Sequence, residues 1–410
     1  MRFVCNQFIN KLSIPMKNNI KHYLHLRYLL YFFALVSGWP CVFFLMGWLP
    51  HYTINYILLF IISFVYFLHK RKFKVPKSIA TLIFVQIILW FMYSIIHGLD
   101  TSYYTRIFLL CITYLLLEIQ VETKRLEFLK TYNFWLTFQV VAGALGFILV
   151  LLGLLVPLYE FREFDGRPGY FFGLFTTNTY ITDLIRNAGF FDEPGTLAFW
   201  GVYALLINKL FIENKRVELL LLFGLISTLS MAYFIQIIIY VYSFYKKSIK
   251  KLIFPTITFI LTLSIIASFN ERMHDSVFGR FEIDEQTGRL KGDNRSDLME
   301  TCFELFKTSP VFGLGARNLI LKSEEMGKFV GANAYFTLAC DGLVGQVITW
   351  LPFFFMFLLG TKDKKIQSAF WIIIVGLLQR PYDSTQLLYP LLSYSIILHS
   401  YLKLKAPIKS

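Results

Sequence analysis

The chain has 410 residues, of which 56% are hydrophobic, 18% aromatic and only 16% charged, and its mean hydropathy is +0.56. A soluble domain has about 45–50% apolar and about 25% charged residues. Here the apolar residues also come in long blocks bounded by lysine clusters. These properties exclude a soluble enzyme, a disordered protein and a coiled coil. The formal net charge of +14 would by itself indicate nucleic-acid binding. Its meaning here depends on where the charged residues lie along the chain.

The apolar blocks predict twelve membrane spans, because a helix needs about 20 mainly apolar residues to cross the hydrocarbon. The first 27 residues are too polar for a cleavable signal peptide, so the first span is expected to be an uncleaved signal anchor. Segment 217–245 has basic residues at both ends, which favours two short helices that turn at 227–230. The predicted spans are 28–48, 52–69, 79–97, 103–119, 132–157, 195–212, the two helices of 217–245, 252–268, 333–359, 366–379 and 384–402.

The predicted fold is an all-α polytopic membrane helix bundle, a single integral domain over 1–410 with both termini in the cytoplasm. The segments assigned to the inside carry a net charge of +20, and those outside carry −6. The basic balance therefore orients the protein in the bilayer and predicts no nucleic-acid partner. Of the basic residues, 21 of 26 inside are lysine, whereas 10 of 14 outside are arginine. Arginine suits bidentate contacts with phosphate, so anion recognition is expected at the outer face.

The first long outer loop, 159–194, leads into RNAGFFDEPGTLAFW at 186–200. Arg186, Asp192 and Glu193 cluster there, just where the chain re-enters the membrane. One interpretation is structural, because acidic residues and a proline at a helix N-terminus complement the helix dipole. The other is catalytic, with a carboxylate at the membrane edge acting as a general base.

The second long outer loop, 269–332, contains an amphipathic helix predicted near 294–308. The apolar residues Leu298, Cys302, Leu305 and Phe306 recur at helical spacing. This helix is expected to lie along the membrane surface or against the bundle, with Arg295 at its start. Two glycines follow it, Gly313 and Gly315. They permit either a tight turn or the close approach of a ligand to backbone N–H groups.

Further polar residues lie at or inside the last spans. Asn333 opens one span, and Asp341 lies about two turns into it. An acid at that depth is a candidate functional residue, and its alternative role is an ion pair with an outer-loop arginine. Arg380 is either an anion contact or an interfacial anchor, and Arg106 is predicted to be an anchor. No cysteines or histidines have metal-ligand spacing, so no metal or cofactor is predicted.

Together these motifs resemble the bacterial O-antigen polymerase and O-antigen ligase families. The resemblance rests on R-N-x-G-F-F-x-E-P-G at 186–195, Arg295 before the amphipathic helix, P-x-F-G-L-G at 310–315, and N-x-Y with D-G-L-V-G at 333–345. It implies a GT-C-like glycosyltransferase at the outer face of the cytoplasmic membrane. The implied substrate is a glycan on undecaprenyl pyrophosphate, and further expected partners are the bilayer, a flippase and a chain-length regulator.

The residues can be assigned to roles in such a transfer. Arg186 and Arg295 are expected to stabilise the leaving pyrophosphate, with Arg317 and Arg289 next. Glu193 is the expected base for the acceptor hydroxyl, with Asp192 in reserve. The remaining candidates are expected to contact the substrate; they are Arg380, Asn333, Asp341, Gly313 and Gly315.

Other functions stay open at this point. Ligases are similar to each other in having a histidine beside the N-x-Y stretch, where this chain has Ala332. That difference favours the polymerase. A flippase or other transporter would more often show internal repeats and charges deep in several spans. A non-catalytic scaffold of an assembly complex would tolerate replacement of the outer arginines.

Overall fold

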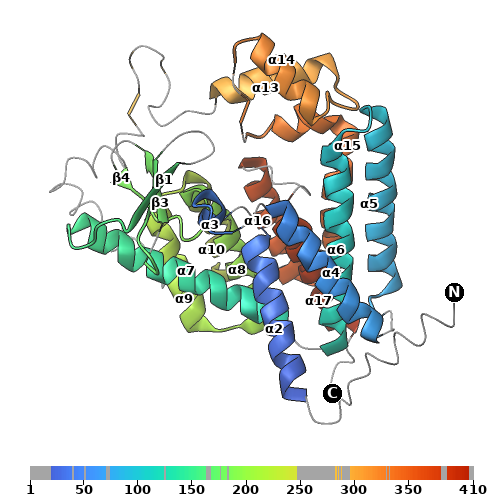
Figure 1. Ribbon diagram of the computed structural model, residues 1–410, viewed down its shortest axis with the longest axis horizontal. Helices are drawn as coiled ribbons and strands as arrows, with labels where there is room; N and C mark the ends of the chain where they lie inside the picture. The colour runs from blue at the N-terminus through green and yellow to red at the C-terminus, as the bar shows by residue number, and fades with distance from the viewer. Residues whose placement is uncertain are drawn as a thin grey trace.

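The computed structural model is mostly helical (Figure 1). It describes residues 20–38, 41–49, 52–70, 74–123, 126–162, 168–175, 177–181, 184–246, 296–328, 330–331, 333–379 and 386–405, with isolated residues between 282 and 288. The predicted span 252–268 lies outside these residues. So do the predicted site residues Arg289, Arg295 and Arg380, together with Ala332.

The helices follow the apolar blocks of the sequence. In the first half they are α2 (Ile20–Ser37), α3 (Val42–Leu45), α4 (Tyr52–Lys70), α5 (Lys77–Ile96), α6 (Thr101–Thr123) and α7 (Glu127–Leu151). In the second half they are α8 (Pro194–Ile207), α9 (Lys215–Gly224), α10 (Met231–Tyr245), α13 (Ser296–Thr308), α14 (Ala316–Glu325), α15 (Phe336–Gly360), α16 (Lys364–Gln379) and α17 (Leu388–Lys405). A π-helical turn, η1 (Asn208–Ile212), extends α8, and a 3-10 turn, η2 (Leu225–Thr228), extends α9.

Within the described residues, five helices are long and apolar enough to cross a membrane. They cover Lys77–Ile96, Thr101–Val121, Glu127–Val150, Pro194–Ile212 and Phe336–Gly360. Shorter apolar helices cover Arg27–Ser37, Tyr52–Leu68 and Met231–Tyr245. The chain thus has the helices of a membrane-embedded protein. Twelve spans and a GT-C-like arrangement stay predictions.

The prediction of one continuous span over 28–48 is wrong. Helix α2 ends at Ser37 and α3 starts only at Val42. At Gly38 the start of α17 comes very close: a Cβ there would lie 2.7 Å from Leu388 Cγ, and the Gly38 carbonyl accepts the Leu388 N–H at 3.1 Å. Hydropathy averaged over a window does not register such a break, although the sequence Gly-Trp-Pro at 38–40 is a helix-breaking signal.

The predicted turn within 217–245 is confirmed. Helix α9 ends at Gly224, η2 follows, and α10 begins at Met231. Between them Leu229 adopts a left-handed conformation with φ of 49°. Each helix alone is short, with 10 residues in α9 and 15 in α10.

The first long loop contains a small antiparallel sheet, so the all-α prediction is incomplete. Its strands are β1 (Tyr159–Arg162), β2 (Pro168–Phe171), β3 (Thr177–Ile181) and β4 (Leu184–Ile185), paired in chain order. The register pairs Tyr159 with Phe171 and Gly169 with Thr179. Gly169 is needed because a Cβ there would lie 2.3 Å from the Phe161 ring. Strands of two to five residues give no signal in a search for 20-residue apolar blocks.

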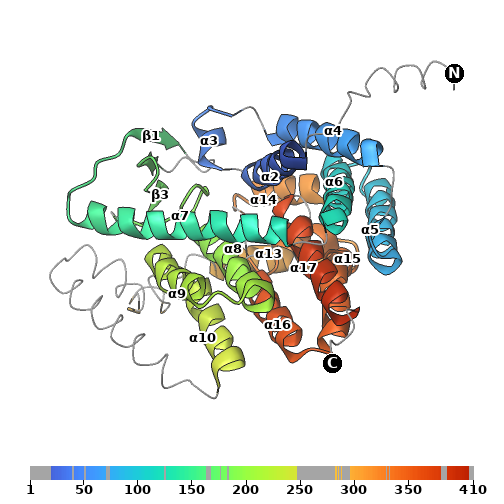
Figure 2. The same cartoon turned by 90° about the horizontal axis from the view of Figure 1, so that it is seen from below.

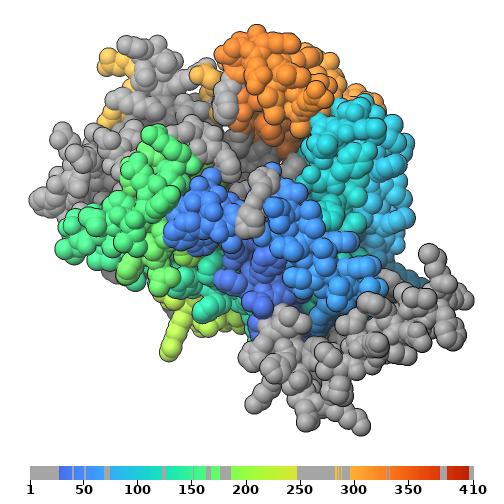
Figure 3. All heavy atoms as spheres, in the orientation of Figure 1, coloured from blue at the N-terminus to red at the C-terminus, as the bar shows by residue number. Residues whose placement is uncertain are grey.

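The second long loop contains the predicted amphipathic helix as α13, which is thereby confirmed. Cys302 and Leu305 of α13 pack with Leu319 of α14 and with Ala339 and Cys340 of α15 in one buried cluster. The sequence did not predict α14. The orange surface of α13 and α14 rises as a lobe above the cyan α5 and α6 in Figure 3.

Helix α8 forms the centre of the bundle, with every residue from Pro194 to Ile207 buried. It packs against α7, α9, α10 and α16. Figure 2 shows α7 running across the bundle between α2 on one side and α8 and α9 on the other. The fully buried α8 thus begins directly after the RNAGFFDE segment.

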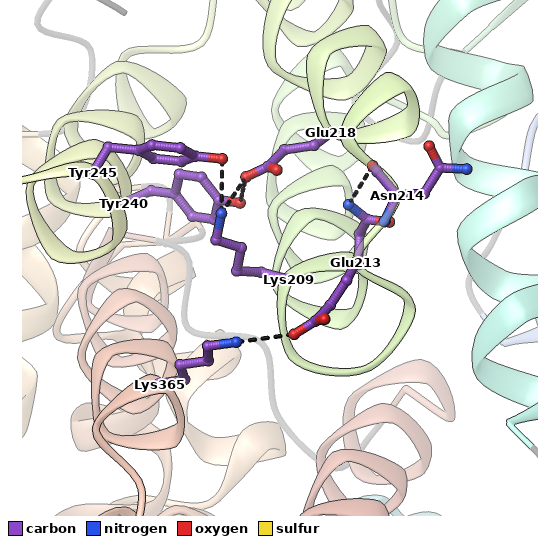
Figure 4. A network of polar contacts seen from close by, with 8 residues as sticks. Lys209, Glu213, Asn214, Glu218, Tyr240, Tyr245 and Lys365 are labelled. Atoms are coloured by element: carbon purple, nitrogen blue, oxygen red, sulfur yellow. Dashed lines mark hydrogen bonds and ion pairs between the residues drawn. The ribbon is translucent and has the colours of Figure 1, made fainter. Parts of the chain in front are cut away.

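At the far end of α8 a polar network joins η1, α9 and α10 (Figure 4). The Lys209 ammonium lies 3.0 Å from Glu218 Oε1 and donates to the Tyr245 hydroxyl at 2.7 Å. The Tyr240 hydroxyl also donates to Glu218. A second pair, Lys365 and Glu213, spans 2.9 Å, but its side chains are 48% and 60% exposed.

The two ion pairs should differ sharply in their effect on stability. Lys209→Met leaves the Glu218 carboxylate buried without its cation, and we expect a loss of roughly 3 kcal/mol or more in the free energy of unfolding. Lys365→Met removes an equally short but exposed pair, worth about 0–1 kcal/mol. Thermal midpoints of both purified variants in one detergent measure this difference. Equal midpoints would contradict it.

Candidate functional site

The segment 186–191 is held against α7 by side-chain amides. Gln139 Oε1 accepts the Phe190 N–H at 2.9 Å, and Asn187 Oδ1 accepts the Gly189 N–H at 2.9 Å. Asn187 is fully buried against α7, where a Cβ at Gly143 would lie 1.9 Å from Asn187 Oδ1. Glycine at 143 is therefore required for the amide of Asn187 to fit.

The same segment also fills the break between α9 and α10. The Asn187 N–H donates to the Ser227 carbonyl at 3.2 Å, and Asn187 Nδ2 donates to Ser227 Oγ at 2.9 Å. On the other side the Val42 N–H of α3 donates to the Phe190 carbonyl at 2.9 Å. The Phe190 ring stacks on Trp135 with centroids 5.5 Å apart. Three separate parts of the chain, namely α7, η2 and α3, thereby fix the position of this segment.

Glu193 lies at the N-cap of α8 in an extended conformation, and Pro194 follows at the first helical position. The Thr196 hydroxyl donates to Glu193 Oε1 at 3.4 Å. Asp192 and Glu193 are both half-buried. The helix dipole therefore stabilises these carboxylates, as the structural interpretation expects. Both residues keep partial exposure, and the catalytic interpretation stays a prediction.

Arg186 is the first residue of this segment and is only 7% exposed. It directly precedes Asn187, and so it shares the anchoring of that residue. A cation and two carboxylates are thereby carried on eight residues whose backbone is fixed. A fixed cation can stabilise an anionic leaving group, and a nearby carboxylate can accept a proton. These are the two minimum requirements for transferring a sugar away from a pyrophosphate.

Asp341 lies in a buried ion pair with Arg106 of α6. Arg106 Nη1 is 2.8 Å from Asp341 Oδ2, and the Tyr103 hydroxyl donates to Oδ1 at 3.1 Å. The guanidinium also lies over the Trp90 ring, 4.4 Å from its centroid. Asp341 thus forms a structural ion pair, but its partner is a helix arginine and not the outer-loop arginine that was expected. The prediction of Arg106 as an interfacial anchor is wrong, because it is 2% exposed inside the bundle.

Gly313 and Gly342 lie against each other where α15 is broken. Gly342 has φ of 67° and ψ of −174° within the helix, a conformation essentially restricted to glycine. A Cβ on Gly342 would lie 2.4 Å from the Gly313 nitrogen. The N–H groups of Leu314 and Gly315 donate to the carbonyls of Ala339 and Cys340, at 3.0 and 2.8 Å. The N–H groups considered for a ligand are therefore bonded to α15.

Asn333 connects the start of α15 to α13 and is 1% exposed. Its Nδ2 donates to the Gly331 carbonyl at 2.8 Å and to Cys302 Sγ at 3.1 Å. Its Oδ1 accepts the Tyr335 N–H at 2.8 Å. The amide thus holds the lobe of α13 and α14 on the bundle. Contact between Asn333 and a substrate stays a prediction.

Arg317 is exposed at the start of α14, beside the turn between α5 and α6. Its backbone N–H donates to Asp100 Oδ2 at 3.3 Å. Burial raises the pKa of Asp100, but hydrogen bonds from Ser102 and Arg317 and the nearby His97 outweigh it and hold that pKa below its usual value. This contact uses only the Arg317 backbone. The Arg317 side chain lies at the surface.

Sequence reasoning missed the residues that position the site. Gln139 and Gly143 lie four residues apart in an otherwise apolar stretch of α7, and a polar side chain at that depth was the available signal. Among the described residues no group of three or more His, Cys, Asp or Glu side chains could hold a metal ion. Comparison of the chain with protein-family models, curated proteins and solved structures finds no match.

The contact between the two glycines makes a specific prediction about Gly342→Ala. The side chain would meet backbone atoms at 2.4 Å, and the left-handed conformation alone costs about 1–3 kcal/mol. Gly327 also has positive φ, of 62°, but a Cβ there meets nothing within 4 Å. Gly327→Ala is therefore the matched control, and thermal midpoints should fall much further for Gly342→Ala. Equal midpoints would mean that the close approach is unimportant.

Proposed function

We propose that the chain is a membrane glycosyltransferase that polymerises a polysaccharide such as an O-antigen, a capsule or an exopolysaccharide. It transfers the growing glycan from undecaprenyl pyrophosphate onto a lipid-linked repeat unit. The support from the sequence is the order of its four motifs, with alanine at position 332 favouring polymerase over ligase.

The observation that carries the proposal is the anchoring of segment 186–193. Gln139, Asn187 and Ser227 fix its backbone, and α8 begins at its end. Catalysis of glycosyl transfer needs charged groups held still, because donors that are already in place require no reorganisation when charge develops. The segment supplies such groups in Arg186 and Glu193.

In the proposed reaction an acceptor hydroxyl oxygen forms a bond to C1 of the donor sugar. The bond between C1 and the pyrophosphate oxygen breaks, and its electron pair leaves with the pyrophosphate. Arg186 stabilises that developing charge, with Arg295, Arg317 and Arg289 as further cationic candidates. Glu193 accepts the proton of the hydroxyl, and Asp192 is the reserve base. Arg380 and Asn333 stay proposed substrate contacts. Asp341 is instead committed to Arg106, and the turn with Gly313 and Gly315 is bonded to α15.

The proposed setting is the outer face of the cytoplasmic membrane, in a twelve-span, GT-C-like bundle with both termini in the cytoplasm. The five apolar helices support a membrane location. The net charge of +20 on the segments assigned to the inside supports the orientation. The proposed partners are the lipid-linked oligosaccharide, a flippase and a chain-length regulator.

Two substitutions test the site in a strain that lacks the chromosomal gene and expresses the variants. Glu193→Gln removes the base and Arg186→Ala removes the cation, and we expect each to lower long-chain polymer at least 100-fold. Single repeat units should accumulate on their acceptors. Gel profiles of extracted glycans, with membrane abundance measured by immunoblot, provide the measurement.

Glu213→Gln is the control, because it makes the same chemical change at an exposed residue next to η1. It should leave the polymer unchanged. Normal long chains from both site variants would overturn the site assignment. In the strain without the gene, long chains retained on the lipid carrier would indicate a ligase, and loss of all outer-face glycan would indicate a transporter.

A further inference from the structure

The turn from Ser309 to Gly315, between α13 and α14, lies beside the outer turns of two candidate spans. The Phe312 ring is 6.2 Å from the Tyr93 ring, which belongs to α5. The Val344 N–H of α15 donates to the Val311 carbonyl at 3.1 Å. Tyr93 and Val344 both lie inside helices long and apolar enough to span a membrane. The 309–315 turn therefore reaches to the depth of these helices.

The carbonyls of the turn are paired as hydrocarbon demands, and the N–H groups of Ser309, Gly313, Leu314 and Gly315 also have protein partners. All seven carbonyls from Ser309 to Gly315 accept a hydrogen bond. In chain order, the donors are Gly313 N, Leu343 N, Val344 N, His97 Nε2, Ser309 Oγ, Asn318 Nδ2 and Leu319 N. A turn in water needs no such completeness, because the solvent satisfies its carbonyls, whereas irregular backbone at membrane depth must find protein partners.

The side chains at the tip of the turn are apolar and exposed. Val311 is 49% exposed and Phe312 43%. The two spans also carry exposed apolar residues near their contacts with the turn, namely Ile95 and Ile96 at the end of α5, Leu99 just after it, and Leu343, Val344 and Val347 on α15. The tip thus continues a surface that faces lipid if α5 and α15 cross the bilayer.

The charges around the turn fit the same placement. No charged residue lies between Lys307 and Arg317, and both of these flanking side chains are exposed. Long basic side chains extend from an apolar surface to the phosphate level of a bilayer. The two residues therefore bracket the stretch that would enter the hydrocarbon.

We infer that the 309–315 turn is inserted into the bilayer and that lipid acyl chains cover Val311 and Phe312. The inference goes beyond the proposed enzymatic function and does not depend on it. It gives the P-V-F-G-L-G motif a role: Gly313 and Gly315 let the backbone bond to the broken helix while the two apolar residues face lipid. Arg317, the second residue after the turn, then lies at the level of the lipid phosphates.

Spin labels in reconstituted vesicles test the inference. A nitroxide is attached to a ketone-bearing amino acid at position 312, so that the native cysteines remain. Positions 343 and 324 carry the same label as references, because Leu343 is exposed on a candidate span and Glu324 is exposed on α14. Collision with oxygen, which concentrates in hydrocarbon, is compared with collision with a water-soluble nickel complex.

We expect the label at position 312 to favour oxygen as strongly as the label at 343, and the label at 324 to favour nickel. A label at position 311 serves as a second reporter, in case substitution at 312 disturbs the fold. Preference for nickel at both 311 and 312 would overturn the inference. Protection of both positions from both reagents would overturn it too, since another protein segment would then cover the tip.

Discussion

The constraint on which this structure depends is that backbone groups away from water must be hydrogen-bonded by the protein. Two helical regions are broken, at Gly342 in α15 and around η2 between α9 and α10. In each case a long loop supplies the missing partners. The 309–315 turn bonds to both sides of Gly342, and Asn187 bonds to Ser227 in η2. The two most distinctive sequence motifs are therefore also the segments that complete the breaks.

This arrangement explains how a site can be rigid although its residues lie in loops. Segment 186–193 has little regular structure, yet its amides are bonded to α7 and η2, and it leads straight into the fully buried α8. Charged groups carried on such a segment keep their positions during a reaction, which is the condition for electrostatic stabilisation of a developing charge. The buried pair of Arg106 and Asp341 has a different effect. Its two charges neutralise each other and join α6 to α15.

The sequence predicted those features that depend on local periodicity. The amphipathic α13 was found that way, and the turn within 217–245 was found from the length of the segment and the basic residues at both of its ends. Features that depend on distant partners could not be found. Hydropathy placed Arg106 near an interface, because nothing local shows that Asp341, 235 positions later, neutralises it. The glycines suggested a ligand loop. Their actual partner is the broken backbone of α15, which nothing in the local sequence shows. The small sheet was missed because its strands are short and its pairing is set by the loop.

The central claim is that this chain extends a glycan on its lipid carrier. It is tested most directly by incubating the purified wild-type protein, reconstituted in vesicles, with repeat units linked to undecaprenyl pyrophosphate. We expect products that differ by whole repeat units, remain on the carrier and appear together with free undecaprenyl pyrophosphate. Unchanged substrate after incubation with folded protein would contradict the claim. So would transfer of single units to a different acceptor without any chain extension.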